Sequence, residues 1–242
     1  MKKIPTISVI VPVFNEERTI PSIIEIVRTW GRAHDVIVID DGSTDTTRSA
    51  IRQFSSSVTL IDLPENTGKG NAVAQGILKA TGEIIMFLDG DIVGLTHHDL
   101  DTLVDTFLSK KAAMVCANTR MDGSLETDFF NGLTGLRVMN KCDLLPLVPL
   151  MTSIGFGLEL LLNDALKKKK IVFIRLPHVY ILSKFEKQSM PQAVVSYVKE
   201  ARELVAQTVR TNAKAFTPSA RRLLGGVIYY LQKAAETLTS DV

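Results

Sequence analysis

The chain has 242 residues, of which 45% are hydrophobic and 22% charged, and its 28 Lys and Arg against 26 Asp and Glu give a net charge of +2. This composition excludes a disordered chain, a collagen-like repeat and a coiled coil. Two cysteines, Cys116 and Cys142, are too few for a disulfide framework and lack the spacing of a zinc site. We therefore expect a globular protein from a reducing compartment.

Short β-branched runs alternate with helical patterns in the first half of the chain. The predicted strands are Ile7 to Val11, Val36 to Ile39, Val58 to Ile61, Ile84 to Leu88 and Ala113 to Cys116. Continuous apolar runs of this kind are typical of parallel strands buried on both faces. The helices predicted between the strands are Glu17 to Trp30, Asp45 to Phe54, Gly70 to Ala80 and His97 to Leu108.

The helix ends carry their own signals. Gly82 should close the third helix, and Thr96 with Asp99 should form a capping box at the start of the fourth. The alternation of strands and helices predicts an α/β fold with a doubly wound, mainly parallel, Rossmann-like sheet. In such a fold, ligands bind at the carboxyl ends of the strands.

The regular alternation of predicted strands and helices ends after about residue 120. The sequence predicts a glycine-bounded segment around Leu136 to Leu145 and then a helix from Leu158 to Lys168. It predicts two strands after that, Ile171 to Ile174 and Val179 to Leu182, followed by two helices, Pro191 to Arg210 and Pro218 to Leu238. Since no linker or repeat separates these parts, we expect residues 1–242 to form one domain with a helical C-terminal extension. We predict no signal peptide, and the prolines and glycines between Leu144 and Leu162 argue against a membrane span.

Polar residues cluster where three predicted strands end. Strand one runs into Pro12-Val13-Phe14-Asn15-Glu16, strand two into Asp40-Asp41-Gly42-Ser43 and strand four into Asp89-Gly90-Asp91. Two carboxylates at i and i+2 can hold a hard divalent ion and leave positions for substrate phosphate, and Gly90 would ease the turn between them. In the alternative interpretation, Asp40 and Asp41 cap a helix and Asp89 and Asp91 are surface turn residues.

Four motifs, in order, resemble those of the family 2 glycosyltransferases, which have the A-type (GT-A) fold. They are SVIVPVFNEERTI, VIVIDDGSTDTT, NTGKGNAVAQGILKATGEIIMFLDGDIVGL and a weaker LTGLRVMNKCDLL, within residues 5 to 142. The resemblance implies an inverting, metal-dependent enzyme that uses Mg²⁺ or Mn²⁺ and a nucleotide-diphosphate sugar, with UDP-sugars favoured over GDP-sugars. It also implies a nucleotide-sugar-binding half at 1–120, an acceptor-side half at 121–190 and C-terminal helices at 191–242.

The resemblance also implies roles for individual residues near the donor. Pro12, Phe14, Asn15 and Glu16 would line the base and ribose pocket, Asp41 would bond the base edge, and Lys69 would lie near the nucleotide. Asp89, Gly90 and Asp91 would form the DXD-like metal site, in which Asp89 reaches the ribose or the metal and Asp91 binds the metal that bridges the diphosphate.

Within the family, the chain looks most like polyprenyl-phosphate sugar transferases and glucosyl-phosphoglycerate-type synthases, so a phosphate-bearing or lipid-linked acceptor is expected. Arg120 and Arg137 would anchor its phosphate, although a structural salt bridge would explain either arginine equally well. Glu159 is the candidate base, or alternatively an acid at a helix N-terminus. His178 could complete the metal shell, although a lone histidine is more often structural.

The basic residues allow a second kind of contact. The run from Lys167 to Lys170 fits a solvated helix end, but with Arg221, Arg222 and the apolar residues up to Tyr230 it could rest on anionic lipid. The apolar residues between Arg222 and Tyr230 could equally pack on the sheet, which we favour, or form a homodimer contact. We expect a cytoplasmic protein that is at most peripheral at the inner membrane face and does not bind nucleic acid. A nucleotide-sugar-binding or regulatory protein whose chemistry has lapsed is the alternative function.

Overall fold

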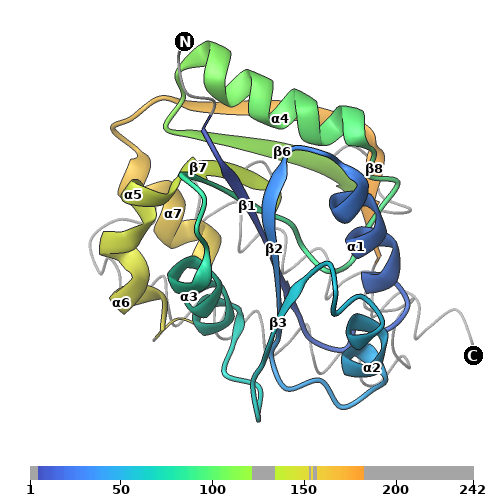
Figure 1. The fold of residues 1–242 in the computed structure, drawn as a ribbon. Coiled ribbons are helices and arrows are strands. Elements are labelled where there is room, and N and C mark those ends of the chain that lie inside the picture. Colours follow the sequence, from blue (N-terminus) through green and yellow to red (C-terminus); the bar gives the residue numbers. More distant parts are fainter. Residues whose placement is uncertain (1–4, 122–133, 153, 155–156, 183–242) are drawn as a thin grey trace, which may run out of the picture. The chain divides into compact units, whose positions relative to one another are not determined.

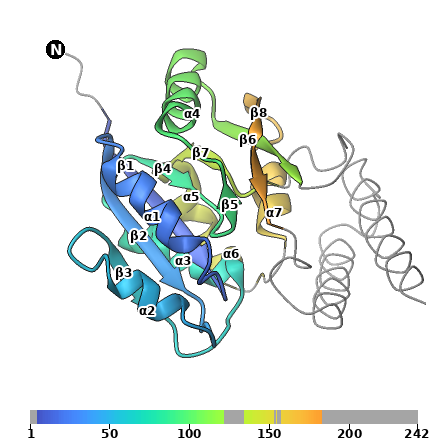
Figure 2. The same ribbon diagram turned by 90° about the vertical axis from the view of Figure 1, so that its right-hand side faces the viewer.

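The computed structural model describes residues 5–121, 134–152, 154 and 157–182, and the side chains of residues 119–121 lie outside that description. Contacts divide the chain into two compact units, Met1–Arg120 with Gly132–Ile181 and Met121–Asn131 with Leu182–Val242. Nearly all the described residues belong to the first unit, which Figures 1 and 2 show from two directions. The predicted helices at 191–210 and 218–238, including Arg221 and Arg222, lie outside the described residues.

A sheet of eight strands forms the centre of this unit, in the order β3-β2-β1-β4-β7-β6-β8-β5. The strands are β1 Ile7–Val13, β2 Ala33–Asp40, β3 Thr59–Asp62, β4 Ile84–Phe87, β5 Ile92–Val93, β6 Met114–Met121, β7 Arg137–Asn140 and β8 Ile171–Ile181. β1 pairs in parallel with β2 and β4, and β2 pairs in parallel with β3. β7 is antiparallel to both β4 and β6. The α/β class is confirmed, but the sheet is mixed rather than mainly parallel.

Helices cover both faces of the sheet. They are α1 Ile20–Thr29, α2 Thr47–Arg52, α3 Lys69–Lys79, α4 His97–Lys110, α5 Lys141–Leu144, the 3₁₀ turn η2 Leu145–Leu147, α6 Val148–Met151 and α7 Leu158–Leu166. β1 alternates between two hydrophobic cores: Val9 and Val11 pack with α1, α2 and α4, whereas Ile10 packs with α3, α6 and α7. The continuous apolar runs in the sequence therefore correspond to strands buried on both sides.

Several predicted elements have different limits or environments. The strand expected at Ala113 to Cys116 extends to Met121 and lies beside β7 rather than beside a parallel partner. β7 lies within the segment around Leu136 to Leu145, for which the sequence predicts no strand. β8 is a single strand across the expected gap between Ile174 and Val179, because Leu176 and Val179 are both buried.

The helix signals were partly correct. The capping box at Thr96 and Asp99 is confirmed, since each side chain bonds the backbone of the other residue. Gly82 does not close α3, which ends at Lys79; its lack of a Cβ instead allows it to pack against the Ser8 backbone. Among the described residues, no helix is long and apolar enough to cross a bilayer.

Candidate active site

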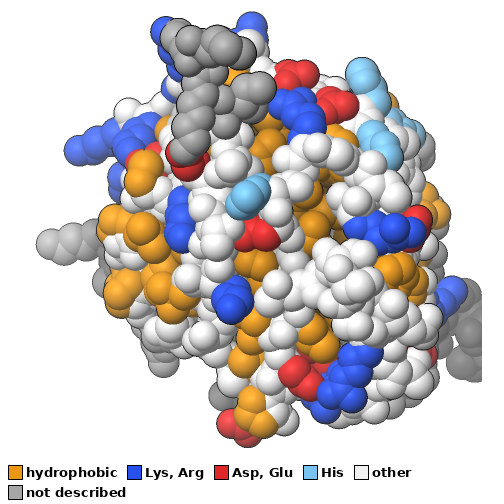
Figure 3. Space-filling model, in the orientation of Figure 1, with side chains coloured by type: hydrophobic (Ala, Val, Ile, Leu, Met, Phe, Trp, Pro, Cys, Tyr) orange, Lys and Arg blue, Asp and Glu red, His pale blue; other side chains and the backbone are white. Residues whose placement is uncertain are grey.

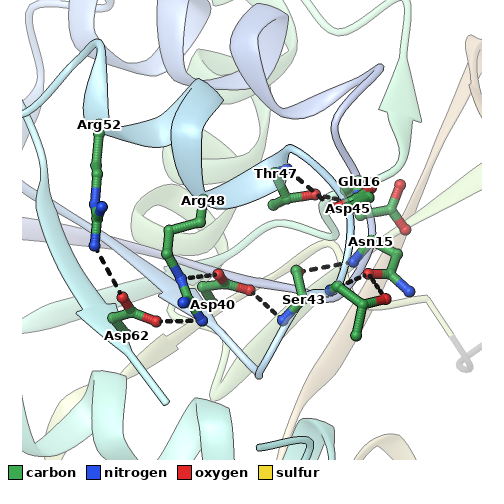
Figure 4. Close-up of polar contacts among 10 residues, drawn as sticks. Asn15, Glu16, Asp40, Ser43, Asp45, Thr47, Arg48, Arg52 and Asp62 are labelled. Atoms are coloured by element: carbon green, nitrogen blue, oxygen red, sulfur yellow. Dashed lines mark hydrogen bonds and ion pairs between the residues drawn. The ribbon is translucent and has the colours of Figure 1, made fainter. Parts of the chain in front are cut away.

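The loops that follow β1 and β2 are bonded to each other at the carboxyl edge of the sheet (Figure 4). The Asn15 N–H donates to Ser43 Oγ at 2.9 Å, and Asn15 Oδ1 accepts from the Thr44 N–H at 2.8 Å. Asn15 has a φ of 58°, which asparagine tolerates better than most residues. The Glu16 N–H donates to Thr47 Oγ1 at 2.7 Å. The predicted base-and-ribose segment is therefore held in a fixed shape by its neighbour.

The two aspartates after β2 brace the surrounding backbone. Asp41 is buried and accepts hydrogen bonds from the Thr67 N–H at 2.8 Å and the Gly68 N–H at 2.9 Å. Asp40 accepts from the Ser43 N–H at 2.9 Å and forms an ion pair with Arg48 at 3.3 Å (Figure 4). Asp40 thus has a structural role, although it braces the turn after β2 rather than capping a helix as in the alternative interpretation. Asp41 holds the loop from which α3 begins.

Three charged side chains from distant parts of the chain meet where α3 begins. Lys69 Nζ lies 2.6 Å from Asp89 Oδ1 and 2.7 Å from Glu159 Oε1. Lys69 is the first residue of α3, Asp89 follows β4, and Glu159 is in the first turn of α7. A cation at a helix N-terminus is opposed by the helix dipole, so the two carboxylates must hold it there. We call Lys69, Asp89 and Glu159 the lysine cluster.

The contacts in the lysine cluster fix the charges of Lys69 and Asp89. Burial alone would lower the pKa of Lys69, but the Asp89 and Glu159 carboxylates outweigh that effect and raise it above its ordinary value. Burial alone would raise the pKa of Asp89, but the Lys69 ammonium, the Gly135 N–H and the charge of Arg137 together hold it below its ordinary value. Near neutral pH, Lys69 is therefore a cation and Asp89 an anion.

Gly135 is a site residue that sequence reasoning did not single out. Its N–H donates to Asp89 Oδ2 at 2.9 Å, and a Cβ at this position would overlap the Asp89 carboxylate. Close backbone approach of this kind requires glycine. Asn163 was missed too, although it lies four residues after Glu159 on α7, and that spacing places both on one helix face.

Gly135→Ala should displace the Asp89 carboxylate and break its bond to the Gly135 N–H. We expect the free energy of unfolding to fall by about 1 to 3 kcal/mol, as for other overpacked sites. Urea denaturation measures this change, with Gly31→Asn as the control, since nothing lies within 4 Å of a Cβ at Gly31 and asparagine tolerates its positive φ. Equal stability of Gly135→Ala and wild type would contradict the close approach.

The remaining donor-side residues lie at the carboxyl ends of β1 and β4. Phe14 is 40% exposed at the end of β1, and Pro12 lines a small cavity together with Lys69, Asp89 and Glu159. Gly90 does not have a positive φ, so the turn itself does not require glycine there. Glycine is required instead because a Cβ at this position would crowd the Val13 side chain. The Gly90 carbonyl accepts from Thr19 Oγ1 at 2.7 Å, which ties the Asp89–Asp91 turn to the start of α1.

Arg137 does not occupy the position expected of an acceptor anchor. Its side chain is buried, with Nε donating to the Thr134 carbonyl at 2.7 Å and Nη1 donating to Asn163 Oδ1 at 2.7 Å. The guanidinium lines the inner wall of the same small cavity, whose volume of about 10 Å³ is at the lower limit for one water. These bonds give Arg137 a structural role, and its role as an acceptor anchor stays a prediction.

The predicted metal ligands are only partly brought together. Across residues 5–121, 134–152, 154 and 157–182, no three His, Cys, Asp or Glu side chains gather closely enough to hold a metal ion. His178 is not supported as a metal ligand, because its Nε2 lies 3.0 Å from Asp99 Oδ2 at the α4 capping box. Arg120 is within β6, and its side chain lies outside the described residues.

Asp89 and Asp91 remain as donors of the right chemistry. Both carry the carboxylate oxygens that Mg²⁺ and Mn²⁺ prefer. A carboxylate offers about four lone-pair sites, and the structure gives Asp89 two partners, Lys69 Nζ and the Gly135 N–H. The two carboxylates therefore have the donor chemistry that a divalent ion needs.

Residues 8–151 match the family model described as "Glycosyl transferase family 2". The chain belongs to this family. The match spans every element from β1 to α6, including the loops after β1 and β2, and Lys69 and Asp89 of the lysine cluster. The family suggested by the four sequence motifs is thus confirmed.

Several curated proteins are similar to this chain. Glucosyl-3-phosphoglycerate synthase of Mycobacterium tuberculosis is 37% identical over 95 residues, covering 36% of this chain and 29% of that protein. Dolichyl-phosphate beta-glucosyltransferase of Drosophila melanogaster is 37% identical over 99 residues, covering 35% of this chain and 30% of that protein. Undecaprenyl-phosphate 4-deoxy-4-formamido-L-arabinose transferase of Pectobacterium carotovorum is 31% identical over 97 residues, covering 37% and 30%. The chain thus matches less than a third of the length of these curated relatives.

Solved structures extend the likeness beyond the first strands. The crystal structure of the Mycobacterium tuberculosis synthase with Mn²⁺, UDP-glucose and phosphoglyceric acid has a TM-score of 0.59 and 25% identity to this chain. It covers 73% of this chain and 72% of that one. The predicted GT-A fold is confirmed by this likeness.

Proposed function

We propose that this chain transfers a sugar from a nucleotide-diphosphate sugar, most favourably a UDP-sugar, to an acceptor that carries a phosphate or a lipid-linked phosphate. The observation that carries the proposal is the lysine cluster at the carboxyl edge of a family 2 fold. Its ammonium is held beside Asp89, where a family 2 enzyme would bind the donor diphosphate. Free thiols at Cys116 and Cys142 support a cytoplasmic location.

The donor would lie along the loops after β1 and β2. The exposed ring of Phe14 offers a stacking surface for the base, and Asn15 and Glu16 offer polar groups to the ribose. Asp41 would act chiefly through the Thr67–Gly68 loop, because Thr67 and Gly68 already donate three hydrogen bonds to it and leave about one lone-pair site for the base edge. Lys69 would face the diphosphate and offset its charge.

Asp89 and Asp91 would hold a Mg²⁺ or Mn²⁺ ion. When bound, such an ion neutralises the diphosphate as it leaves. Asp89 would in addition keep Lys69 pointing toward the donor through their 2.6 Å contact. The neighbouring Gly135 backbone would fix the orientation of Asp89.

Glu159 would act at the acceptor side of the lysine cluster. A phosphate oxygen is a competent nucleophile near neutral pH, whereas a sugar or glycerate hydroxyl needs a base. Glu159 could serve as that base only by exchanging its 2.7 Å contact with Lys69 for one with the acceptor. With a phosphate acceptor, its role would be to position Lys69.

The test of this function is a panel of UDP- and GDP-sugars, each with Mn²⁺, Mg²⁺ or a chelator, measured by thermal shift and by nucleotide release. We expect a UDP-sugar to stabilise the protein only when metal is present, and slow nucleotide release to signal turnover. If a nucleotide-sugar stabilises the protein but no nucleotide is released with any acceptor, the result would favour a nucleotide-sugar-binding protein whose chemistry has lapsed. No stabilisation by any nucleotide would refute both functions.

Asp91→Asn should remove the metal dependence of nucleotide binding, because a hard cation loses a charged oxygen ligand. We expect the affinity for UDP in the presence of Mn²⁺ to fall at least about tenfold, as when metal-site residues are changed. Isothermal titration of UDP with and without Mn²⁺ measures this affinity. Asp105→Asn, at an exposed position on α4, is the matched control. A metal response in Asp91→Asn equal to that of wild type would rule out this ligand.

A further inference from the structure

An apolar surface lies on η2 and α6, outside the candidate active site. Leu145 is 44% exposed and Leu150 is 52% exposed, and Pro146 and Pro149 between them are exposed as well. No charged residue occurs from Leu144 to Thr152. We call Leu145, Pro146, Pro149 and Leu150 the apolar face. Figure 3 shows hydrophobic side chains gathered over α5 and α6 on this side of the molecule.

Lysines border the apolar face. Lys167, Lys168, Lys169 and Lys170 are all exposed at the end of α7. Lys169 Nζ lies 2.7 Å from Asp143 Oδ1 on α5, which brings the run next to the apolar face. Lys170 donates to the Lys110 carbonyl at 2.8 Å, so the basic end of α4 adjoins it too. We call Lys167 to Lys170 the lysine rim.

The lysine rim carries excess positive charge. The acidic residues paired with it are Asp143, which contacts Lys169, and Asp164, which contacts Lys167 at 2.7 Å. Within the described part of the chain, four lysines thus face two aspartates. Exposed leucines beside surplus lysines are the combination that binds an anionic bilayer, where apolar side chains enter the headgroup boundary and ammonium groups meet lipid phosphates.

We propose that the apolar face and the lysine rim together dock on the surface of an anionic lipid bilayer. A second copy of the chain fits this surface less well. A two-fold contact would place the same patch of both copies together, which pairs the leucines but brings no acidic group of that patch to the surplus lysines. An anionic surface satisfies both the leucines and the lysines.

The docking surface also adjoins the lysine cluster. Gly70, directly after Lys69, packs so closely on the carbonyls of Met151 and Ile154 that a Cβ would overlap them. The end of α6 therefore contacts the first turn of α3. If the proposed function holds, a lipid-linked phosphate would reach Lys69 from this side; bilayer binding itself does not depend on that function.

The experiment is co-flotation of the full-length protein with vesicles of phosphatidylcholine, with and without phosphatidylserine, at low and high salt. Two variants weaken the surface, Leu145→Ser with Leu150→Ser and Lys167→Gln with Lys168→Gln. The matched control is Arg28→Gln with Arg52→Gln, which removes two exposed charges from α1 and α2. Circular dichroism melts and light scattering confirm that each variant is folded and report its oligomeric state.

We expect wild type and the arginine control to float only with anionic vesicles and to be released by salt. Each lysine removed should weaken binding about fivefold at low salt, and the leucine variant should lose most of its binding. The proposal is overturned by equal binding to neutral vesicles, by no binding to anionic vesicles, or by unchanged binding in both variants, which would place the contact elsewhere. Dimers dissociated by the leucine substitutions, without vesicle binding, would instead assign the surface to self-association.

Discussion

Replacing Lys69 by methionine should lower the free energy of unfolding by about 3 kcal/mol, the cost of leaving largely buried charges without their partner. Asp89 and Glu159 are only 15% and 12% exposed, and without the ammonium they would face each other as two like charges. Binding of a nucleotide-diphosphate sugar should fall on the order of 10²-fold, since a cation beside the diphosphate is lost. Urea denaturation and isothermal titration measure the two effects.

Two comparisons make the Lys69→Met result specific. Lys79→Met, at the exposed end of α3, should change little in either the free energy of unfolding or the binding of a nucleotide-diphosphate sugar. In wild type, the pKa of Asp89 lies below its ordinary 3.8, so its stabilisation is complete above pH 3.8 and is lost as pH falls through the lower folded value. The stability gap between wild type and Lys69→Met should therefore narrow below about pH 4. A gap independent of pH would contradict the ion pair.

Arg137→Met should cost about 3 kcal/mol of unfolding free energy or more. The guanidinium donates to the buried Thr134 carbonyl and to the half-buried Asn163 side chain, and a buried acceptor that loses its donor costs about 1 to 3 kcal/mol, to which the loss of the second hydrogen bond adds. Arg137→Lys should recover only part of the loss, because an ammonium cannot reproduce the planar fork of donors. Chemical denaturation measures both variants.

The matched control for Arg137 is Arg28→Met, an exposed arginine paired with Glu25 on α1. Its stability should change by less than about 1 kcal/mol. If Arg137→Met were as stable as wild type and only weakened acceptor binding, the acceptor role predicted from the sequence would be supported and the structural assignment would be wrong.

The parallel half of the fold was predictable because its signals are local. Runs such as Ile7 to Val11 are apolar without alternation, and α1 places Ile20, Ile23, Ile24 and Val27 on its buried face as the spacing predicts. β7 was not predicted as a strand because its short sequence begins with Arg137, and a buried arginine in a strand gives no hydrophobic pattern.

The candidate site was predictable in its strand ends but not in its pairings. Residue types and order pointed to Lys69, Asp89 and Glu159 separately. The lysine and Glu159 are 90 residues apart in sequence, and no local pattern indicates that α7 returns to the start of α3. Asp41 shows the complementary difficulty, because an aspartate that binds a ligand and one that holds a backbone loop look the same in sequence.

The bonds between the loops after β1 and β2 have a consequence for exchanging parts among related enzymes. Asn15 bonds Thr44, and Glu17 Oε2 accepts from the Thr46 N–H at 2.9 Å, so each loop supplies the other's partners. A graft of residues 14–17 alone from a relative would replace the acceptors Asn15 Oδ1 and Glu17 Oε2 and leave the N–H donors of the second loop mismatched. The two loops should therefore be transplanted together, and a chimera carrying both should recover the nucleotide preference of its source, whereas either loop alone should not.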